Sequence, residues 1–414
     1  MLRRIYLDNS ATTPIAPEVL DAMLPYLKDK FGNASSIHFF GQEARAAVDK
    51  ARHQVAALIN ARPAEIIFTS GGTESNNLAL RGLLESQIQK PDQKAGRFFD
   101  ENGEIKHHII TTAIEHPAVK SVCEDLEKLH GYEITYLPAY ENGIIRIEDV
   151  KDAIRAETIL ISVMLANNEI GTLQPLEEIG QLVKELRADG RKTYFHTDAV
   201  QAAGKVPVDV EAIGCDLLSM SGHKIYAPKG IGALYVRRGV RLHSQNIGGR
   251  QERGTRGGTE SVPNIVAFGK ACELTGEELA ESATRLGDLR DRFEQGVFER
   301  IHEVILNGDA VLRLPNISNL SFSRIEGEGL LINLDMQGIA VSTGSACSSG
   351  SLEPSPVIRA LGREDELARG AIRFSFGRFN TEDDLTRILE ALPVAVENLR
   401  RLAPKTKMIA AELS

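Results

Sequence analysis

The sequence of 414 residues lacks tryptophan, has only 5% aromatic residues and contains only four cysteines, Cys123, Cys215, Cys272 and Cys347. The cysteines form no C-x-x-C pair and share no zinc-ligand spacing with histidine, so no zinc module is indicated. Four scattered cysteines also cannot serve as the disulfide framework of so long a chain. We therefore expect free thiols in a reducing compartment.

Long apolar runs and an excess of positive charge are absent as well. No stretch approaches the ~20 apolar residues that cross a bilayer, and Asp8 interrupts the N-terminal segment before a signal-peptide core could form. The 48 Lys and Arg against 57 Asp and Glu leave a net charge of −9, which disfavours binding to nucleic-acid phosphates. These absences predict a cytoplasmic protein with no membrane and no nucleic-acid partner.

What is present is the composition of a folded globular chain, 42% hydrophobic and 25% charged. From about residue 17 to 262, short apolar runs rich in β-formers alternate with helical periodicity. The expected strands are 65–69, 108–112, 134–137, 158–163, 193–196, 215–219 and 232–236, and the expected helices are 41–60, 116–130, 147–155 and 176–188. This alternation predicts a large α/β domain over 17–262, with a mostly parallel sheet that binds ligands beyond the carboxyl ends of its strands.

The pattern changes after residue 263. An uninterrupted helix is expected over 264–299, and the later elements are short strands at 304–306, 316–321 and 371–374 and a last helix at 381–402. We expect these elements to form a smaller α+β domain, made of residues 1–16 and 263–414. The polar segment 87–107 is punctuated by proline and glycine, which predicts a surface insertion.

Two segments at expected strand ends carry groups that suit a phosphorylated cofactor. Ser70-Gly71-Gly72-Thr73 separates a strand from a helix, and its glycines let backbone N–H groups approach an anion. A plain strand–helix turn explains this loop about equally well. Lys224 follows a strand among small residues and His223, where crowding would make a neutral amine available for a Schiff base. A solvated loop lysine is the commoner alternative.

Three further positions add to this set. Asp198 lies at a strand end, where its carboxylate suits a pyridinium nitrogen, although such residues are more often caps or turns. His116 lies at a strand-to-helix junction and suits ring stacking or proton transfer, although a lone histidine is more often structural. Cys347 lies in the small-residue run 342–351, which suits a mobile nucleophilic thiol. Each signal is weak alone, but together they favour pyridoxal phosphate.

An ordered series of motifs extends nearly from end to end of the chain. Its members are Tyr6–Pro14, Thr69–Asn77, Glu115-His116, Asn167–Gly171, His196–Gln201, Ser221–Lys224, Gln251–Thr259, Gly344–Cys347 and Ala371–Ser375. On these motifs the sequence resembles the cysteine desulfurases of the NifS/IscS type, in the class V aminotransferase family of fold-type I pyridoxal phosphate enzymes. The resemblance implies a mostly parallel seven-stranded sheet flanked by helices, together with a smaller α+β domain.

The resemblance also implies a role for each matching residue. Lys224 would hold the cofactor covalently and move the α-proton of the substrate, His116 would stack on the ring and assist proton transfer, and Cys347 would accept sulfur. The remaining implied contacts are to the phosphate (Gly72, Thr73, Ser221, His223 and, from the second subunit of a homodimer, Thr259), to the cofactor ring (Asp198, Gln201, Asn168) and to the substrate (Arg373, Asn168).

The implied reaction takes sulfur from L-cysteine and leaves L-alanine and a persulfide on Cys347. The persulfide would pass to an iron–sulfur scaffold or to another sulfur acceptor. No resident metal is implied, apart from a transient contact between Cys347 and an iron–sulfur cluster.

Three other functions were weighed against this interpretation. A class V aminotransferase needs no loop cysteine, so Cys347 argues against it. A selenocysteine lyase shares the cofactor site and stays open. A catalytically silent sulfur carrier would be expected to have lost Lys224, Asp198 or Arg373, and all three are present.

Overall fold

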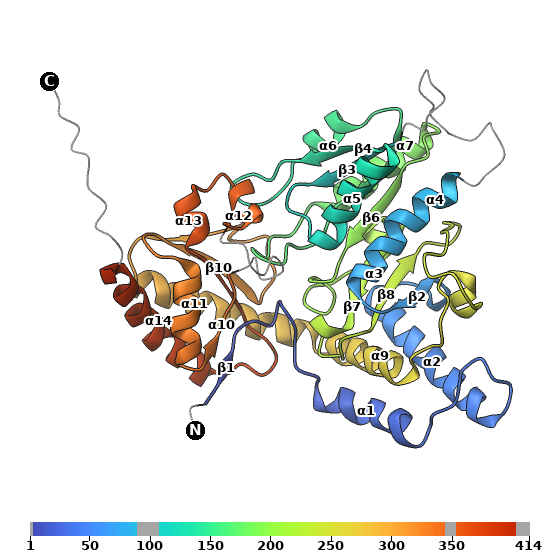
Figure 1. The fold of residues 1–414 in the computed structure, drawn as a ribbon, viewed down its shortest axis with the longest axis horizontal. Coiled ribbons are helices and arrows are strands. Elements are labelled where there is room, and N and C mark those ends of the chain that lie inside the picture. Colours follow the sequence, from blue (N-terminus) through green and yellow to red (C-terminus); the bar gives the residue numbers. More distant parts are fainter. Residues whose placement is uncertain (1–2, 89–106, 344–352, 403–414) are drawn as a thin grey trace.

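The computed structural model describes residues 3–88, 107–343 and 353–402 (Figure 1). The predictions made for Cys347 and for most of the 87–107 insertion lie outside these described residues.

A seven-stranded sheet forms the centre of the larger part of the molecule, with strand order β2-β8-β7-β6-β5-β3-β4. The strands are β2 (Ile66–Thr69), β3 (His108–Thr112), β4 (Glu133–Leu137), β5 (Thr158–Ser162), β6 (Tyr194–Asp198), β7 (Leu217–Ser221) and β8 (Gly232–Val236). Only β8 is antiparallel, to β2 and to β7, and the other pairs are parallel. The predicted α/β class and its mostly parallel sheet are confirmed.

Helices cover both faces of this sheet because its strands are apolar on both sides. Along β2, Ile66 and Phe68 join one core cluster and Ile67 joins another, as the alternation of side chains along a strand requires. The first face is covered by α1 (Pro17–Lys28), α2 (Phe39–Leu58), α6 (Ile147–Ala153), α7 (Leu176–Ala188), α8 (Val210–Ile213) and α9 (Val262–Glu277). The second is covered by α3 (Gly72–Asn77), a π-helical turn (Leu78–Gly82), α4 (Leu83–Ile88) and α5 (Pro117–His130).

A separate core lies beside this sandwich (Figure 1). Its antiparallel sheet has the order β12-β10-β9, and a parallel pair joins β1 (Ile5–Tyr6) to β11 (Ile339–Ala340). The other elements of this region are β9 (Val304–Leu306), β10 (Ile317–Phe322), β12 (Ala371–Ser375), α10 (Leu279–Arg300), α11 (Gly327–Met336), α12 (Pro356–Ala360), α13 (Asp365–Arg369) and α14 (Glu382–Leu402). The N-terminal Ile5 and Leu7 are buried in this core. The domain boundaries at residues 16 and 262 stay a prediction.

The prediction of one uninterrupted helix over 264–299 is wrong. The segment is divided into α9 and α10 at Glu278, whose backbone dihedrals are φ −93° and ψ 0°. Gly276 weakens the preceding turn, and the Glu278 carboxylate is held by Arg378 at 3.0 Å. Part of the expected helix therefore packs with the large sheet through α9, and the rest packs with the second core through α10.

The described cysteines behave as core residues. Cys123, Cys215 and Cys272 are free and at most 1% exposed, as the sequence predicts. Burial raises the pKa of the Cys123 thiol to about 12 and raises the pKa values of the other two thiols as well. These three thiols are therefore protonated and unreactive at neutral pH.

No helix in the described ranges is long and apolar enough to cross a membrane.

Candidate active site

A cavity of about 370 Å³ opens where the parallel strands of the large sheet end. Its lining residues follow β2, β3, β5, β6 and β7 or come from the N-terminal segment and β12. They are Ser10, Ala11, Gly72, Thr73, Asn76, His116, Ala118, Met164, Ala166, Asn168, Asp198, Val200, Gln201, Ser221, His223, Lys224 and Arg373. The carboxyl ends of parallel strands meet at one edge of a sheet, which is why segments so far apart in sequence converge here.

Most of the predicted site residues line this cavity together. They are Gly72, Thr73, His116, Asn168, Asp198, Gln201, Ser221, His223, Lys224 and Arg373. Thr259 is exposed and lines a different hollow, beside Tyr26 and Phe31. Cys347 lies outside the described residues.

Lys224 lies in a 3₁₀ turn that directly follows β7. Its Nζ donates hydrogen bonds to the carbonyl oxygens of Ser10 at 2.6 Å and Ala11 at 2.7 Å. Close behind the lysine, Tyr226 adopts a left-handed backbone conformation with φ 70°, which is strained for a bulky residue. Tyr226 N donates to Thr13 Oγ1 at 2.8 Å, so the N-terminal segment holds both the lysine and the turn that follows it.

The Gly71-Gly72 turn after β2 brings the backbone close to the cavity wall. Gly71 has φ +150°, which favours glycine, and a Cβ on Gly72 would lie 2.7 Å from Val200 Cγ2. Any larger residue at position 72 would collide with Val200. This close approach keeps Thr73 at the cavity.

Asp198 ends β6 and is 6% exposed. Its Oδ2 accepts a hydrogen bond from Asn76 Nδ2 at 2.7 Å, and its Oδ1 accepts one from Val200 N at 2.9 Å. These two donors fix the carboxylate at the cavity wall and compensate part of the cost of burying it.

The two histidines of the cavity are held in the neutral form. Burial lowers the pKa of His116, and Lys224 lowers it further, while Asp198 opposes the shift. His116 Nδ1 accepts a hydrogen bond from Ala118 N at 3.1 Å, so the proton of the neutral ring is on Nε2. Burial and the nearby lysines lower the pKa of His223 to about 4. Both side chains are thus polar but uncharged at neutral pH.

Arg373 reaches the cavity from β12, in the second core. Its two terminal nitrogens donate to Asp8 Oδ1 at 2.7 Å and to the Asn168 carbonyl at 2.8 Å. Its Nε is buried and has no hydrogen-bond partner among the residues that the structure describes. A buried guanidinium that keeps a free donor suits a planar anion such as a carboxylate.

The cavity lining fits the pyridoxal phosphate that the sequence predicts. Buried polar atoms of the lining lack partners, namely Ser10 Oγ, Asn76 Oδ1 and Arg373 Nε, and such atoms mark a place where a polar ligand completes the hydrogen bonding. The same lining contains an amine for a Schiff base, a fixed carboxylate and a glycine turn. In the described part of the chain, no cluster of three or more potential metal ligands is found.

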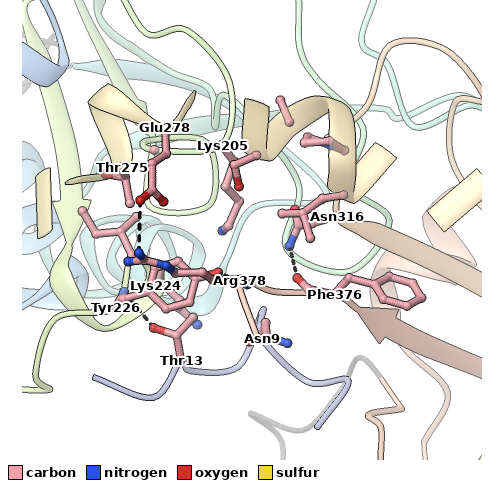
Figure 2. Close-up of a pocket in the computed structure, with 16 residues that line it drawn as sticks. Asn9, Thr13, Lys205, Lys224, Tyr226, Thr275, Glu278, Asn316, Phe376 and Arg378 are labelled. Carbon is pink, nitrogen blue, oxygen red and sulfur yellow. Dashed lines mark hydrogen bonds and ion pairs between the residues drawn. The ribbon is translucent and has the colours of Figure 1, made fainter. Parts of the chain in front are cut away.

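Lys224 also lines a second, much smaller cavity of about 20 Å³ (Figure 2). Lys205, Tyr226, Glu278 and Arg378 contribute to its walls, and Glu278 forms an ion pair with Arg378 at 3.0 Å. Lys224 therefore lines two cavities.

Sequence reasoning assigned no role to several residues that build the site. Ser10 and Asp8 belong to one motif of the sequence and Asn76 belongs to another. Only their contacts in the structure show which site residues they bind. Glu115 is another such residue: it is buried behind the cavity, its Oε1 accepts from Met164 N at 2.7 Å, and burial raises its pKa to about 8. The signal that could have found these residues is their place in the motifs: Asn76 shares one with Thr73, Glu115 shares one with His116, and Asp8 and Ser10 belong to the N-terminal motif.

Comparisons with known proteins agree with this architecture. The model of the aminotransferase class-V family matches residues 5–388. The chain is 50% identical to cysteine desulfurase IscS of Dictyoglomus turgidum over 404 residues, which cover 98% of this chain and 97% of that protein. The chain belongs to the cysteine desulfurases of the class-V aminotransferase family.

Solved structures of similar proteins share the fold of this cysteine desulfurase. A NifS-like protein superimposes with a TM-score of 0.86 at 35% identity, over 96% of this chain and all of that one. SspA in complex with cysteine superimposes with a TM-score of 0.77 at 36% identity, over 91% of this chain and all of that one. The predicted family, fold class and enzyme class are thus confirmed.

Proposed function

We propose that this chain is a pyridoxal phosphate-dependent cysteine desulfurase that converts L-cysteine to L-alanine and transfers the sulfur to its own Cys347. The observation that carries the proposal is the convergence of Lys224, Asp198 and Arg373 on one cavity. An amine, a carboxylate and a guanidinium are the groups needed to hold the cofactor, to keep it electron-deficient and to bind an amino-acid carboxylate. The structure of SspA in complex with cysteine supports the choice of substrate.

The cofactor would be held mainly by residues of the large sheet. In this proposal, Lys224 binds it covalently, Asp198 pairs with the ring nitrogen and His116 stacks on the ring. Gly72, Thr73, Ser221 and His223 hold the phosphate, and Gln201 and Asn168 face the ring oxygen. When bound, pyridoxal phosphate supplies an electron sink for bonds at the α-carbon of the substrate.

Two groups would move protons in this cavity. Lys224 Nζ would take the α-proton of the substrate, because a neutral amine next to the substrate is a general base. His116 carries a proton on Nε2 and stays neutral at neutral pH, so it can donate a hydrogen bond in the cavity and assist proton transfer there.

Arg373 would bind the substrate carboxylate. Asp8 and the Asn168 carbonyl already hold the guanidinium in place, so little side-chain freedom is lost when the substrate arrives. The free Nε donor gives the carboxylate a direct partner.

Both ends of the segment that contains Cys347 are attached beside this cavity. Before the segment, the backbone of Ser342 exchanges hydrogen bonds with that of Arg373. After it, Ser355 Oγ donates to Glu169 Oε2 at 2.6 Å, next to Asn168. Five residues span at most about 18 Å, which keeps Cys347 within that distance of Ser342.

The sulfur transfer needs no further oxidant or reductant. The Cys347 thiolate forms a bond to the substrate sulfur while the carbon–sulfur bond of cysteine breaks, and the electron pair of that bond stays with carbon. A proton on that carbon completes L-alanine, and the enzyme is left as the Cys347 persulfide. The persulfide is then available to an iron–sulfur scaffold or another acceptor. A working thiol of this kind requires a reducing compartment, so we place the enzyme in the cytoplasm.

A homodimer is part of the proposal, with Thr259 reaching the phosphate of the other subunit. The hollow lined by Thr259, Tyr26 and Phe31 adjoins an exposed aromatic face, on which Phe31 is 74% and Phe39 72% exposed. Clustered exposed aromatic side chains are typical of subunit interfaces.

The test is the substitution Cys347→Ser in the purified holoenzyme. The visible absorbance of the bound cofactor should stay, whereas sulfide, persulfide and alanine formation from L-cysteine should be lost. Cys123→Ala, which removes a buried thiol instead, should leave alanine formation intact. Full activity of Cys347→Ser would refute the proposal, and L-selenocysteine as a competing substrate would reveal a selenocysteine lyase.

A further inference from the structure

Lys205 is a half-buried cation that the proposed chemistry does not use. It follows β6, seven residues beyond Asp198, and its Nζ donates to the Gln201 carbonyl oxygen at 2.9 Å and to Gln201 Oε1 at 3.1 Å. Among the described residues, no carboxylate lies within ion-pairing distance of this ammonium. Both of its acceptors thus belong to one neutral residue.

The charges around Lys205 make this placement unfavourable. Lys224 and Arg373 lie close enough to repel it, and burial together with these two cations lowers the pKa of Lys205 to about 7. Lys205 and Lys224 line the same small cavity (Figure 2). The acid of that cavity, Glu278, is paired with Arg378. A half-buried cation with cations near it and no counter-ion costs stability, so its place beside the site points to a functional reason.

A chain of hydrogen bonds connects the two lysines. Gln201 Oε1 accepts from Lys205, Gln201 Nε2 donates to the Ser10 carbonyl at 2.9 Å, and the same carbonyl accepts from Lys224 Nζ at 2.6 Å. Lys205 Nζ donates to the amide oxygen and the Ser10 carbonyl oxygen accepts from the amide NH₂ group, so these two contacts together set the orientation of the amide. The NH₂ end of Gln201 is then the end on the side of the large cavity, which Ser10 also lines.

We propose that Lys205 is a positioning residue, which fixes the Gln201 amide so that its NH₂ group faces the large cavity as a hydrogen-bond donor. This inference rests on the proposed function, in which Gln201 faces the ring oxygen of the cofactor. A donor at that point stabilises the deprotonated oxygen, and an acceptor there would destabilise it. Lys205 therefore keeps the bound cofactor in its deprotonated form down to lower pH.

The test is a pH titration of the visible absorbance of the bound cofactor. In Lys205→Met the amide loses one of the two contacts that set its orientation, so the midpoint of the absorbance change should move up by about one pH unit, a tenfold change in acidity. Lys205→Arg keeps a cationic donor and should restore most of the wild-type midpoint. Lys184→Met removes a surface lysine of α7 and should leave the midpoint unchanged.

A double-mutant cycle shows whether Lys205 acts through Gln201. In a Gln201→Leu background, Lys205→Met should cause little further shift. An unmoved midpoint in Lys205→Met, or an equal shift in both backgrounds, would overturn the inference. If Lys205→Met does not fold, Lys205→Gln makes the same test, because a neutral amide no longer dictates the orientation of Gln201; an unmoved midpoint there counts equally against it.

The two proposals fail in different ways. If the wild type forms alanine from cysteine and shows a visible band, but Lys205→Met titrates like wild type, only the role of Lys205 is wrong. If the wild type shows neither, the proposed function itself is wrong.

Discussion

The seven-stranded sheet and the three-stranded sheet face the same cavity, but they hold their polar side chains in different ways. On the large sheet, Asp198 takes its partners from segments that follow strands of the same sheet, Asn76 in α3 and Val200 in the turn after β6. On the small sheet, Arg373 takes its partners from outside that sheet, from Asp8 after β1 and from Asn168 in the loop after β5.

Cofactor binding and substrate binding would therefore depend on the fold in different ways. The proposed cofactor wall belongs to one core, which sets its geometry before any substrate binds. The proposed substrate contact crosses from one core to the other, so its position depends on how the two cores meet. We expect substitutions on the large sheet to change the binding and the visible spectrum of the cofactor, and substitutions at Arg373 to change substrate affinity alone.

The largest effect is expected from Lys224→Ala. Without the amine, the cofactor has no covalent attachment and the α-proton has no base, so turnover should fall by about 10²–10⁴-fold or more. The visible band and the protein adduct that borohydride reduces should both disappear. Lys229→Ala, in the exposed part of the same loop, is the matched control and should keep both. A reducible adduct in Lys224→Ala would contradict the assignment.

A smaller and more selective effect is expected from Arg373→Lys, which keeps the charge but loses the planar fork. Loss of a charge-assisted hydrogen bond should raise KM for cysteine by about tenfold to a hundredfold, while the visible spectrum stays that of the wild type. Asp8→Asn removes the charge that orients Arg373 but keeps its acceptor oxygen, so KM should rise by less. A changed spectrum in Arg373→Lys would mean that the two walls are not independent, and a lower KM in Asp8→Asn would mean that Asp8 competes with the substrate.

A third effect concerns stability in acid rather than the reaction, and it comes from His196, beneath the cofactor wall. His196 is 0% exposed between Ser162 Oγ at 2.8 Å and Ser219 Oγ at 3.1 Å, and burial lowers its pKa from 6.5 to about 3. The unfolded chain therefore binds a proton here as pH falls below about 6.5, while the folded chain stays neutral. The free energy of unfolding should lose roughly 1.4 kcal/mol per pH unit from this residue between about pH 6 and pH 3.

Urea unfolding at several pH values and one protein concentration measures this slope. His196→Asn should lower it by about that amount, although the variant is less stable at neutral pH. His302→Asn, at an exposed position before β9 in the other region, should leave the slope as in the wild type. An equal slope in wild type and His196→Asn would show that His196 does not stay neutral in the folded protein.

Much of the fold followed from local patterns in the sequence. The bounds of β3, β8, β9 and α7 coincide with the expected ranges, because each is an apolar or amphipathic run with a clear end signal. The break at Glu278 was not predicted, because no proline or strong breaker marks it and the Arg378 partner comes from a segment 100 residues away. Boundaries set by tertiary partners leave no local trace.

The candidate site also has parts that the sequence predicted and parts that it did not. Lys224, Asp198, His116 and the Gly71-Gly72 turn could be selected one by one, because each lies at the end of an expected strand. The hydrogen bonds that Ser10 and Asn76 provide to those residues could not be predicted, because a motif identifies residues and not their contacts.

The sequence by itself determined which chemical groups this protein has and on which kinds of element they lie. It placed an amine, a carboxylate, imidazoles and a glycine turn at strand ends, because the periods of strands and helices are local properties of the chain. Only the tertiary structure decided that Arg373 meets Asp8, 365 residues away, and that Lys205 shares a cavity with Lys224. Those contacts follow from how two cores pack together, which no local pattern encodes.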